Sequence, residues 1–300
     1  MDPSLRRYLH DLVDAARTLL GEDLVGAYAA GSVALDAYQP GRSDVDVALV
    51  VAAPLDAGQK RALVARLRHE ALPCPARGLE LVAYTRAAAG SGTPEPAFEV
   101  ELNTGARMAF RATYDPARRS AADGRFWYGL DRSILHQHGY ALLGPPAAGT
   151  FADPHPDDLR RLLVEALRWW LAPPRSAGAV ADGDGYLERV AAHVDADGGA
   201  GVADGAAGGD VTDRPAAGTE DAVLGACRSL VRVEDGVWLS KLAAGRRVAA
   251  SGRHVDLIER SLAARQGGPP PGRAEARHFQ RWVLHRVADR GYGSPGRPGG

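Results

Sequence analysis

The chain has 300 residues, of which 45% are hydrophobic and 24% charged, enough to bury a core and more than one average domain needs. Its 36 basic and 37 acidic side chains give a formal net charge of -1, which excludes the strong positive field of a general nucleic-acid or anionic-membrane binder. The two cysteines, Cys74 and Cys227, lie far apart, which excludes a disulfide scaffold or a Cys/His zinc site. No apolar run reaches the roughly 18 residues of a membrane span and the N-terminal residues lack a secretory-signal pattern, so we expect a soluble, cytoplasmic protein.

Helix and strand patterns alternate in the first half of the chain. Leu5, Leu9 and Leu12 belong to an apolar series with helical spacing, which predicts an amphipathic helix over residues 1–20. A second helix is predicted at 56–71. Apolar, β-branched runs predict strands at 24–30, 44–51, 79–84 and 97–102.

The second half of the chain has the pattern of helices and loops. Helical periodicity, typical of a bundle, covers 125–138, 156–171, 220–234, 239–250, 254–265 and 273–290. We therefore expect an α+β fold with a sheet domain at 1–124 and a helical domain at 125–290. The segment 195–219 contains seven Gly, seven Ala and five Asp, too little apolar surface to offset its ordering entropy, and predicts a disordered insertion. The tail 291–300 is expected to be flexible.

Two acids open the predicted strand 44–51. Asp44 and Asp46 stand two residues apart, so both side chains project to one face and can jointly hold a hard divalent cation such as Mg²⁺. Gly31 and Ser32 close the preceding strand, where a glycine allows close approach of a ligand and a hydroxyl beside helix amides can bind phosphates. The alternative is that the two aspartates merely form the solvated face of an amphipathic strand.

A third acid, Glu80, lies among apolar, β-forming residues of the strand 79–84. A charge in such a place is costly unless it has a partner, and a metal or a substrate proton would supply one.

These motifs resemble a known superfamily. Gly31-Ser32 followed by Asp44-Val45-Asp46 resembles the nucleotidyltransferases to which DNA polymerase β belongs. Four further stretches resemble aminoglycoside (3'') adenylyltransferases, and with them the likeness covers residues 1–290 outside the insertion: Leu142–Pro145, Asp153–Leu159, Asp221–Leu230 and Gly236–Ala244.

The resemblance implies a nucleotidyltransferase sheet domain with a helical domain that closes over it. Asp44 and Asp46 would bind Mg²⁺ and the nucleotide, Gly31 and Ser32 would lie at the phosphates, and Glu80 would be the base that deprotonates a substrate hydroxyl. Lys241 would reach the phosphates from the helical domain, although a lysine near a helix start is commonly a solvated surface charge. The implied reaction is attack of that hydroxyl on the α-phosphorus of ATP, with release of pyrophosphate.

The expected acceptor is an aminoglycoside or aminocyclitol antibiotic, and two departures from the family bear on it. Arg107 stands where the family has a tryptophan that packs on the drug, and a cation there disfavours a polycationic acceptor. The family places acids before the helix at 220–234; Glu220 and Asp221 are available here, but Gly218 occupies the position of an expected aspartate. As first-turn acids, Glu220 and Asp221 also suit a structural role toward the helix dipole.

Two alternatives to antibiotic modification stay open. One is transfer to another small hydroxylated metabolite, which Arg107 favours. The other is a non-catalytic nucleotide sensor or toxin–antitoxin partner, against which Glu80 argues because binding alone needs no base. The sequence leaves the oligomeric state and nucleotide preference open.

Overall fold

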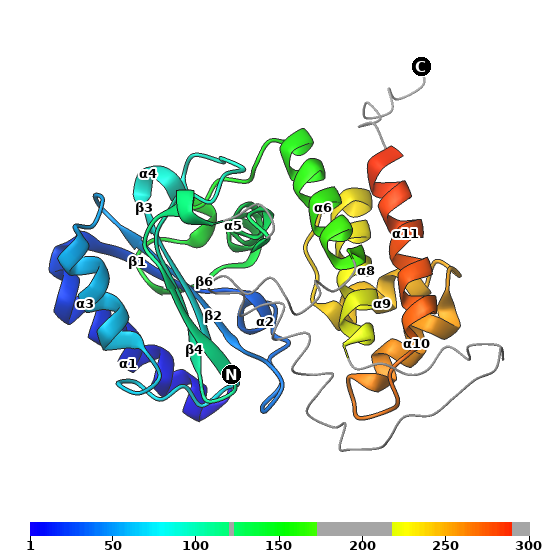
Figure 1. Ribbon diagram of the computed structural model, residues 1–300, viewed down its shortest axis with the longest axis horizontal. Coiled ribbons are helices and arrows are strands. Elements are labelled where there is room, and N and C mark those ends of the chain that lie inside the picture. Colours follow the sequence, from blue (N-terminus) through cyan, green and yellow to red (C-terminus); the bar gives the residue numbers. More distant parts are fainter. Residues whose placement is uncertain (120–122, 173–217, 290–300) are drawn as a thin grey trace, which may run out of the picture. The chain divides into compact units, whose positions relative to one another are not determined.

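The structure is a computed structural model of the full chain (Figure 1). It describes residues 1–119, 123–172 and 218–289. The predicted insertion at 195–219, except for its last two residues, and the tail 291–300 lie outside these ranges. The described residues form two compact units, the first ending at Leu159 and the second beginning at Arg160.

The first unit contains a six-stranded mixed sheet with the strand order β5-β4-β3-β2-β1-β6. Within the described residues its strands are β1 (Leu24–Ala29), β2 (Val45–Val51), β3 (Leu79–Thr85), β4 (Phe98–Gly105), β5 (Met108–Thr113) and β6 (Tyr140–Leu143). Neighbouring strands pair antiparallel, except for the central pair β2 and β3, which is parallel. The four strands predicted from the sequence are confirmed.

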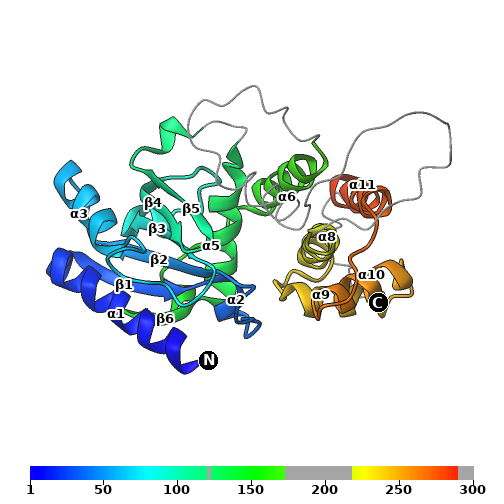
Figure 2. The ribbon, with the colours of Figure 1, turned by 60° about the horizontal axis from the view of Figure 1, so that its bottom comes forward.

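Helices pack on both faces of this sheet (Figure 2). They are α1 (Pro3–Leu20), α3 (Ala57–Leu67) and α5 (Phe126–His138), with the single turns α2 (Gly31–Ala34) and α4 (Arg86–Ala89) and 3-10 turns at Gly21–Asp23, Pro116–Arg118 and Ala147–Gly149. Because strand side chains alternate, Val45 and Val47 join the core under α1 and α3, whereas Ala48, Tyr84 and Phe151 join the core with α5. The two faces of β2 are therefore distinct.

Local sequence signals fix the starts of α1 and α3. The Asp2 carboxylate accepts hydrogen bonds from the Ser4 and Leu5 amides at the start of α1. Asp56 and Gln59 form a reciprocal capping box at the start of α3. Each such cap contributes about 1 kcal/mol, which supports the alignment of both helices on the sheet.

Arg132 of α5 is fully buried beside the sheet. Its guanidinium donates to the carbonyl oxygens of Pro96 at 2.9 Å, Glu95 at 2.6 Å and Thr93 at 2.5 Å, and lies 5.1 Å from the centre of the Tyr84 ring. These contacts compensate the loss of hydration of the buried cation. They also tie the loop before β4 to α5.

The last strand differs from the sequence expectation, which has only helix and loop after residue 125. β6 pairs antiparallel with β1 at the edge of the sheet. Gly144 follows it with φ +90°, and a Cβ there would lie 2.5 Å from the Val25 carbonyl oxygen, so the chain turns tightly against β1. The first unit thus extends to Leu159, beyond the domain boundary expected at 124.

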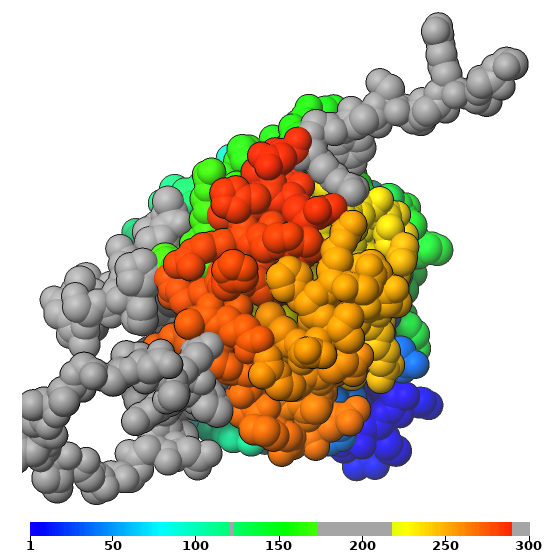
Figure 3. Space-filling model, turned by 90° about the vertical axis from the view of Figure 1, so that its right-hand side faces the viewer, coloured from blue at the N-terminus to red at the C-terminus, as the bar shows by residue number. Residues whose placement is uncertain are grey.

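The second unit is helical, as the sequence predicts. Its elements are the greater part of α6 (Pro156–Leu171), then α8 (Thr219–Asp235), α9 (Lys241–Ala249), α10 (Val255–Ala264) and α11 (Arg273–Asp289). Leu224, Ile258 and Phe279 are fully buried in it. A Cβ on Gly245 would lie 2.6 Å from Leu224 Cδ2, so this glycine lets α9 pack closely on α8. Figure 3 shows the surface formed by α9, α10 and α11.

Both cysteines are buried free thiols, as expected. Burial raises the pKa of Cys227 to about 12, so its thiol stays protonated and inert at neutral pH. Among the described helices, none combines the length and the apolar character needed to cross a bilayer.

Candidate active site

The sheet brings two of the predicted acids together. Asp46 and Glu80 are Cα partners in the parallel register of β2 and β3, so their side chains lie on the same face of adjacent strands. Both are half-buried, whereas Val45 and Val47 beside Asp46 are buried on the opposite face. Asp44, two residues before Asp46, is also half-buried, with 29% of its side chain exposed. The carboxylates therefore lie on the face of the sheet opposite the core under α1 and α3.

Gly31 lies directly against the Asp46 carboxylate. The Ala30 amide donates to the Asp46 carbonyl oxygen at 2.9 Å, which brings the end of β1 onto β2. Gly31 has φ +52°, and a Cβ there would lie 1.9 Å from Asp46 Oδ2 and 2.6 Å from its Cγ. Only glycine fits this conformation and this space without moving Asp46.

The Ser32 hydroxyl is a buried polar atom with no hydrogen-bond partner within the described residues. A buried hydroxyl without a partner costs about 1–3 kcal/mol, so such an atom calls for an explanation by a ligand or a solvent molecule. Ser32 lies in α2, which is a single turn of four residues. Because a helix of four residues has little dipole, the Ser32 hydroxyl is the group of this turn that we expect to bind a ligand.

Replacing Gly31 by alanine tests this contact. The added Cβ displaces the Asp46 carboxylate, so we expect the affinity for ATP with Mg²⁺ and the turnover each to fall about 100-fold, since a shift of about 1 Å at a reacting centre has that effect. Titration calorimetry and steady-state rates measure both. Gly41→Ala is the matched control, because Gly41 also has positive φ (+78°) but has nothing within 4 Å of a Cβ. Equal losses in both variants would assign the effect to backbone strain alone.

Arginine side chains border the acids. Arg77, just before β3, lies with its Nη2 3.9 Å from Asp44 Oδ2. The Arg77 amide donates to the Ser43 carbonyl oxygen at 3.3 Å, so the pairing of the two strands extends back to Asp44. Arg77 is not among the residues predicted from the sequence, where its only signal is its place directly before the strand that carries Glu80.

A polar row continues across the sheet beyond Glu80. Asn103 of β4 is the Cα partner of Glu80, and Arg111 of β5 is the partner of Asn103. Asn103 is 3% exposed. Arg111 donates to Glu101 Oε1 at 2.7 Å, and Arg119 Nη2 lies 3.6 Å from the same oxygen, which compensates the buried Glu101 charge. The alternation of Glu101 and Asn103 along β4 is the sequence signal that could have located this row.

Arg107 lies in the turn between β4 and β5. Its exposed side chain donates to the Gly41 carbonyl oxygen at 2.7 Å, and its amide donates to the Arg77 carbonyl oxygen at 3.2 Å. Arg107 therefore joins the β4–β5 turn to the loop that leads to Asp44. It adds positive charge to the segments around the acids.

The predicted site residues of the second unit lie at the starts of α8 and α9. Lys241 is the first residue of α9, and its Nζ donates to Asp221 Oδ1 at 3.0 Å. Arg265 Nη1 binds the same oxygen. Glu220 stands beside Asp221 in the first turn of α8 and is 7% exposed. Lys241 and Asp221, which the sequence analysis assigned to different ligands, are thus direct partners.

The carboxylate oxygens at the sheet suit a magnesium ion. Within the described ranges no three His, Cys, Asp or Glu side chains are gathered as a complete metal cage. Mg²⁺ is commonly held by one or two carboxylates together with substrate phosphates and water, so the pair Asp44 and Asp46 matches its coordination chemistry.

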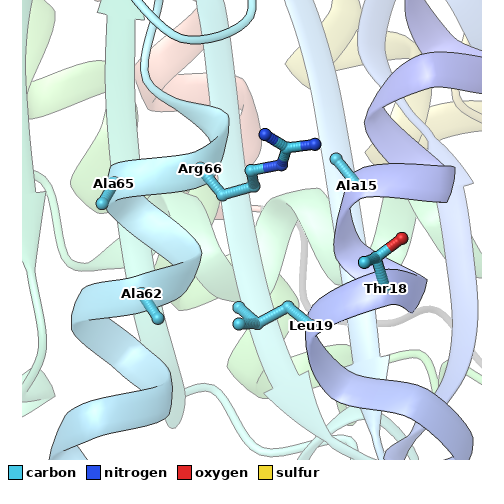
Figure 4. A pocket seen from close by; sticks show the side chains of 6 residues that line it. All are labelled: Ala15, Thr18, Leu19, Ala62, Ala65 and Arg66. Carbon is cyan, nitrogen blue, oxygen red and sulfur yellow. The ribbon is translucent and has the colours of Figure 1, made fainter.

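A shallow groove elsewhere in the first unit lacks this chemistry. It lies between α1 and α3, away from the face that carries Asp46, and has a volume of about 360 Å³ (Figure 4). Its lining residues are Ala15, Thr18, Leu19, Ala62, Ala65 and Arg66. With no acid and one cation among them, the groove has no set of groups for catalysis.

Comparison with solved structures assigns the chain to the nucleotidyltransferase fold, an α+β architecture with a mixed sheet and a helical unit. One of the matched structures is spectinomycin adenyltransferase AAD(9) from Enterococcus faecialis, solved with ATP and spectinomycin. The TM-score is 0.59 at 14% sequence identity, over 95% of this chain and 99% of that chain. The expected fold class is confirmed. No family model and no curated protein matches the sequence.

Proposed function

We propose that the protein is an ATP- and Mg²⁺-dependent nucleotidyltransferase that transfers AMP to a hydroxyl group of an aminocyclitol or aminoglycoside antibiotic. The observation that carries the proposal is the pairing of Asp46 with Glu80 and the contact of Gly31 with Asp46. This arrangement lies in a fold shared with an adenyltransferase solved with ATP and spectinomycin. We place the activity in the cytoplasm, where ATP is available.

Each residue of the site then has a chemical role. Asp44 and Asp46 hold the magnesium ion, which, when bound, orients the triphosphate and neutralises charge that develops on its oxygens. Ser32 donates its hydroxyl to a phosphate oxygen, and Gly31 leaves room for Asp46. Lys241 is assigned to the phosphates through the family resemblance.

Glu80 is the general base of the proposed reaction. The acceptor oxygen forms a bond to the α-phosphorus of ATP, and the bond from that phosphorus to the bridging oxygen breaks. Pyrophosphate leaves with the electron pair, and the hydroxyl proton passes to the Glu80 carboxylate. Glu80 needs to be ionised and within reach of that hydroxyl, and its place beside Asp46 in the register supports the second condition.

Charge around the site favours an acceptor with few ammonium groups. Arg77 lies 3.9 Å from Asp44, and Arg107 binds the Gly41 carbonyl oxygen in the loop that leads to Asp44. Asp221 is already bound by two cations, so it is a poor partner for a drug ammonium group. Spectinomycin-like aminocyclitols satisfy this condition better than polycationic aminoglycosides. The same positive charge supports, as the second candidate, a small hydroxylated metabolite without amines.

An acceptor screen tests the proposal. Purified protein is incubated with α-³²P-labelled ATP, Mg²⁺ and one of three acceptors: spectinomycin, a polycationic aminoglycoside or an uncharged cyclitol. We expect labelled product and pyrophosphate with spectinomycin, and at least about tenfold less with the polycationic drug. Transfer to the cyclitol alone would favour the second candidate. If ATP binds but no acceptor is labelled, antibiotic modification is wrong for this protein.

A further inference from the structure

Three charged side chains of the second unit meet at one carboxylate oxygen. Lys241 Nζ lies 3.0 Å from Asp221 Oδ1, and Arg265 Nη1 binds that oxygen as well. Asp221 stands in the first turn of α8, Lys241 begins α9 and Arg265 caps the end of α10. We call these residues the Asp221 cluster; it links three helices.

The members of the Asp221 cluster differ in exposure. Arg265 has 10% of its side chain exposed, Asp221 28% and Lys241 34%. The guanidinium is thus fixed in the unit, and the ammonium group is the cation that solvent and solutes can reach. Because a carboxylate between two cations offsets their mutual repulsion, Asp221 allows Lys241 to stay near Arg265.

The three side chains of the Asp221 cluster sum to a formal charge of +1, since they are two cations and one anion, and the neighbouring Glu220 of the same turn is 7% exposed. A site that binds an ammonium group needs a carboxylate without a cationic partner, whereas Asp221 already pairs with two cations. A cluster that holds two cations, of which the more accessible one is a lysine, suits an anion such as a phosphate group.

We propose that Asp221 is a positioning residue that holds the Lys241 ammonium group in place for the phosphates of ATP. Arg265 holds Asp221 in turn through the shared oxygen. The inference rests on the proposed function, because it takes ATP as the ligand of Lys241. It reassigns Asp221 from the acceptor to the nucleotide.

Asp221→Asn tests the proposal in the full-length chain. Loss of the charge weakens the hold on Lys241, so we expect the dissociation constant for ATP with Mg²⁺ to rise about tenfold, while the KM for the acceptor stays unchanged. Titration calorimetry without acceptor and steady-state kinetics measure the two quantities. Asp235→Asn is the matched control, because Asp235 ends the same helix and pairs with Arg247 of α9 at 2.9 Å. It is expected to leave ATP affinity unchanged.

A double-mutant cycle separates positioning from general structural damage. If Asp221 acts through Lys241, Asp221→Asn has no further effect on ATP affinity in a Lys241→Met background. Asp221→Glu, which keeps the charge, is expected to recover affinity to within about threefold of the original protein. Should Asp221→Asn fail to fold, Arg265→Gln takes its place in the same cycle, because it removes the partner that holds Asp221.

Lysine NMR gives a second readout. The chain contains two lysines, Lys60 and Lys241, so reductive ¹³C-methylation labels two side chains and the N-terminus. We expect ATP with Mg²⁺ to shift the Lys241 signal and leave that of Lys60, which pairs with Glu99 at 2.9 Å. Asp221→Asn is expected to shift the same Lys241 signal without ATP.

Three results would overturn the inference: unchanged or tighter ATP binding in Asp221→Asn, a raised acceptor KM with intact ATP affinity, or an effect that persists fully in the Lys241→Met background. Failure of the proposed function has a different signature. In that case the original protein itself shows no affinity for ATP with Mg²⁺.

Discussion

Glu80→Gln is expected to lower the rate of AMP transfer about 10³-fold, within the range that a general base contributes. Glutamine has nearly the same shape as glutamate but cannot accept the hydroxyl proton, whereas the Asp44 and Asp46 carboxylates are untouched. We therefore expect the affinity for ATP with Mg²⁺ to change less than threefold. Single-turnover transfer of labelled AMP and ATP titration measure the two effects separately.

The control for this variant is Glu22→Gln. Glu22 is exposed in the 3-10 turn after α1, so the same chemical change there is expected to leave the rate unaltered. Unchanged turnover in Glu80→Gln would remove Glu80 from the role of base. A parallel loss of ATP affinity would assign Glu80 to nucleotide binding instead.

Asp46→Asn is expected to weaken binding of ATP at least about 100-fold in the presence of Mg²⁺, because even indirect partners of metal ligands contribute 10- to 100-fold. An asparagine side chain is neutral and has one oxygen in place of two, so it holds a hard cation poorly. The decisive measurement compares ATP titrations with Mg²⁺ and with EDTA, since the difference between the two disappears in the variant.

Asp36→Asn serves as the control for Asp46. Asp36 is exposed in the loop after α2 and has φ +49°, a conformation that asparagine also tolerates. The variant thus removes one negative charge from the same unit without backbone strain. If both substitutions weaken binding equally, the effect is one of overall charge, and Asp46 is not a metal ligand.

The sequence predicted most of the elements because their signals are local. The helix of residues 1–20 has a clear apolar stripe, and the strand at 44–51 ends in an apolar run from Val47 to Val51. The edge strands β5 and β6 were missed. β6 has four residues, of which Tyr140 is exposed, and β5 contains exposed Phe110, so neither has the buried run that marks a central strand. Their pairing with β1 and β4 stabilises them, and a sequence pattern does not contain that information.

The candidate site also has a part that local sequence signals predict and a part that they do not. The spacing of Asp44 and Asp46 predicts a shared face, and the burial of Val45 and Val47 on the other face agrees with it. The partners supplied by other strands were not predictable. Asn103 lies beside Glu80 only because β4 pairs with β3 in one particular register.

The pairing of Lys241 with Asp221 was also missed. The two bonded residues are 20 positions apart in the chain, one near the start of α8 and the other at the start of α9. Each residue alone is consistent with a solvated position at a helix start, and only the packing of α9 on α8 brings them into contact.

The parallel pairing of β2 and β3 has a consequence for how reliably the protein reaches a functional state. A slip of either strand by one residue would turn Asp46 or Glu80 into the apolar core under α1 and α3 and move a valine or leucine out of that core. Such a register is therefore strongly disfavoured. We expect molecules that complete folding to carry both carboxylates in alignment, because the apolar packing that stabilises the sheet also selects its register.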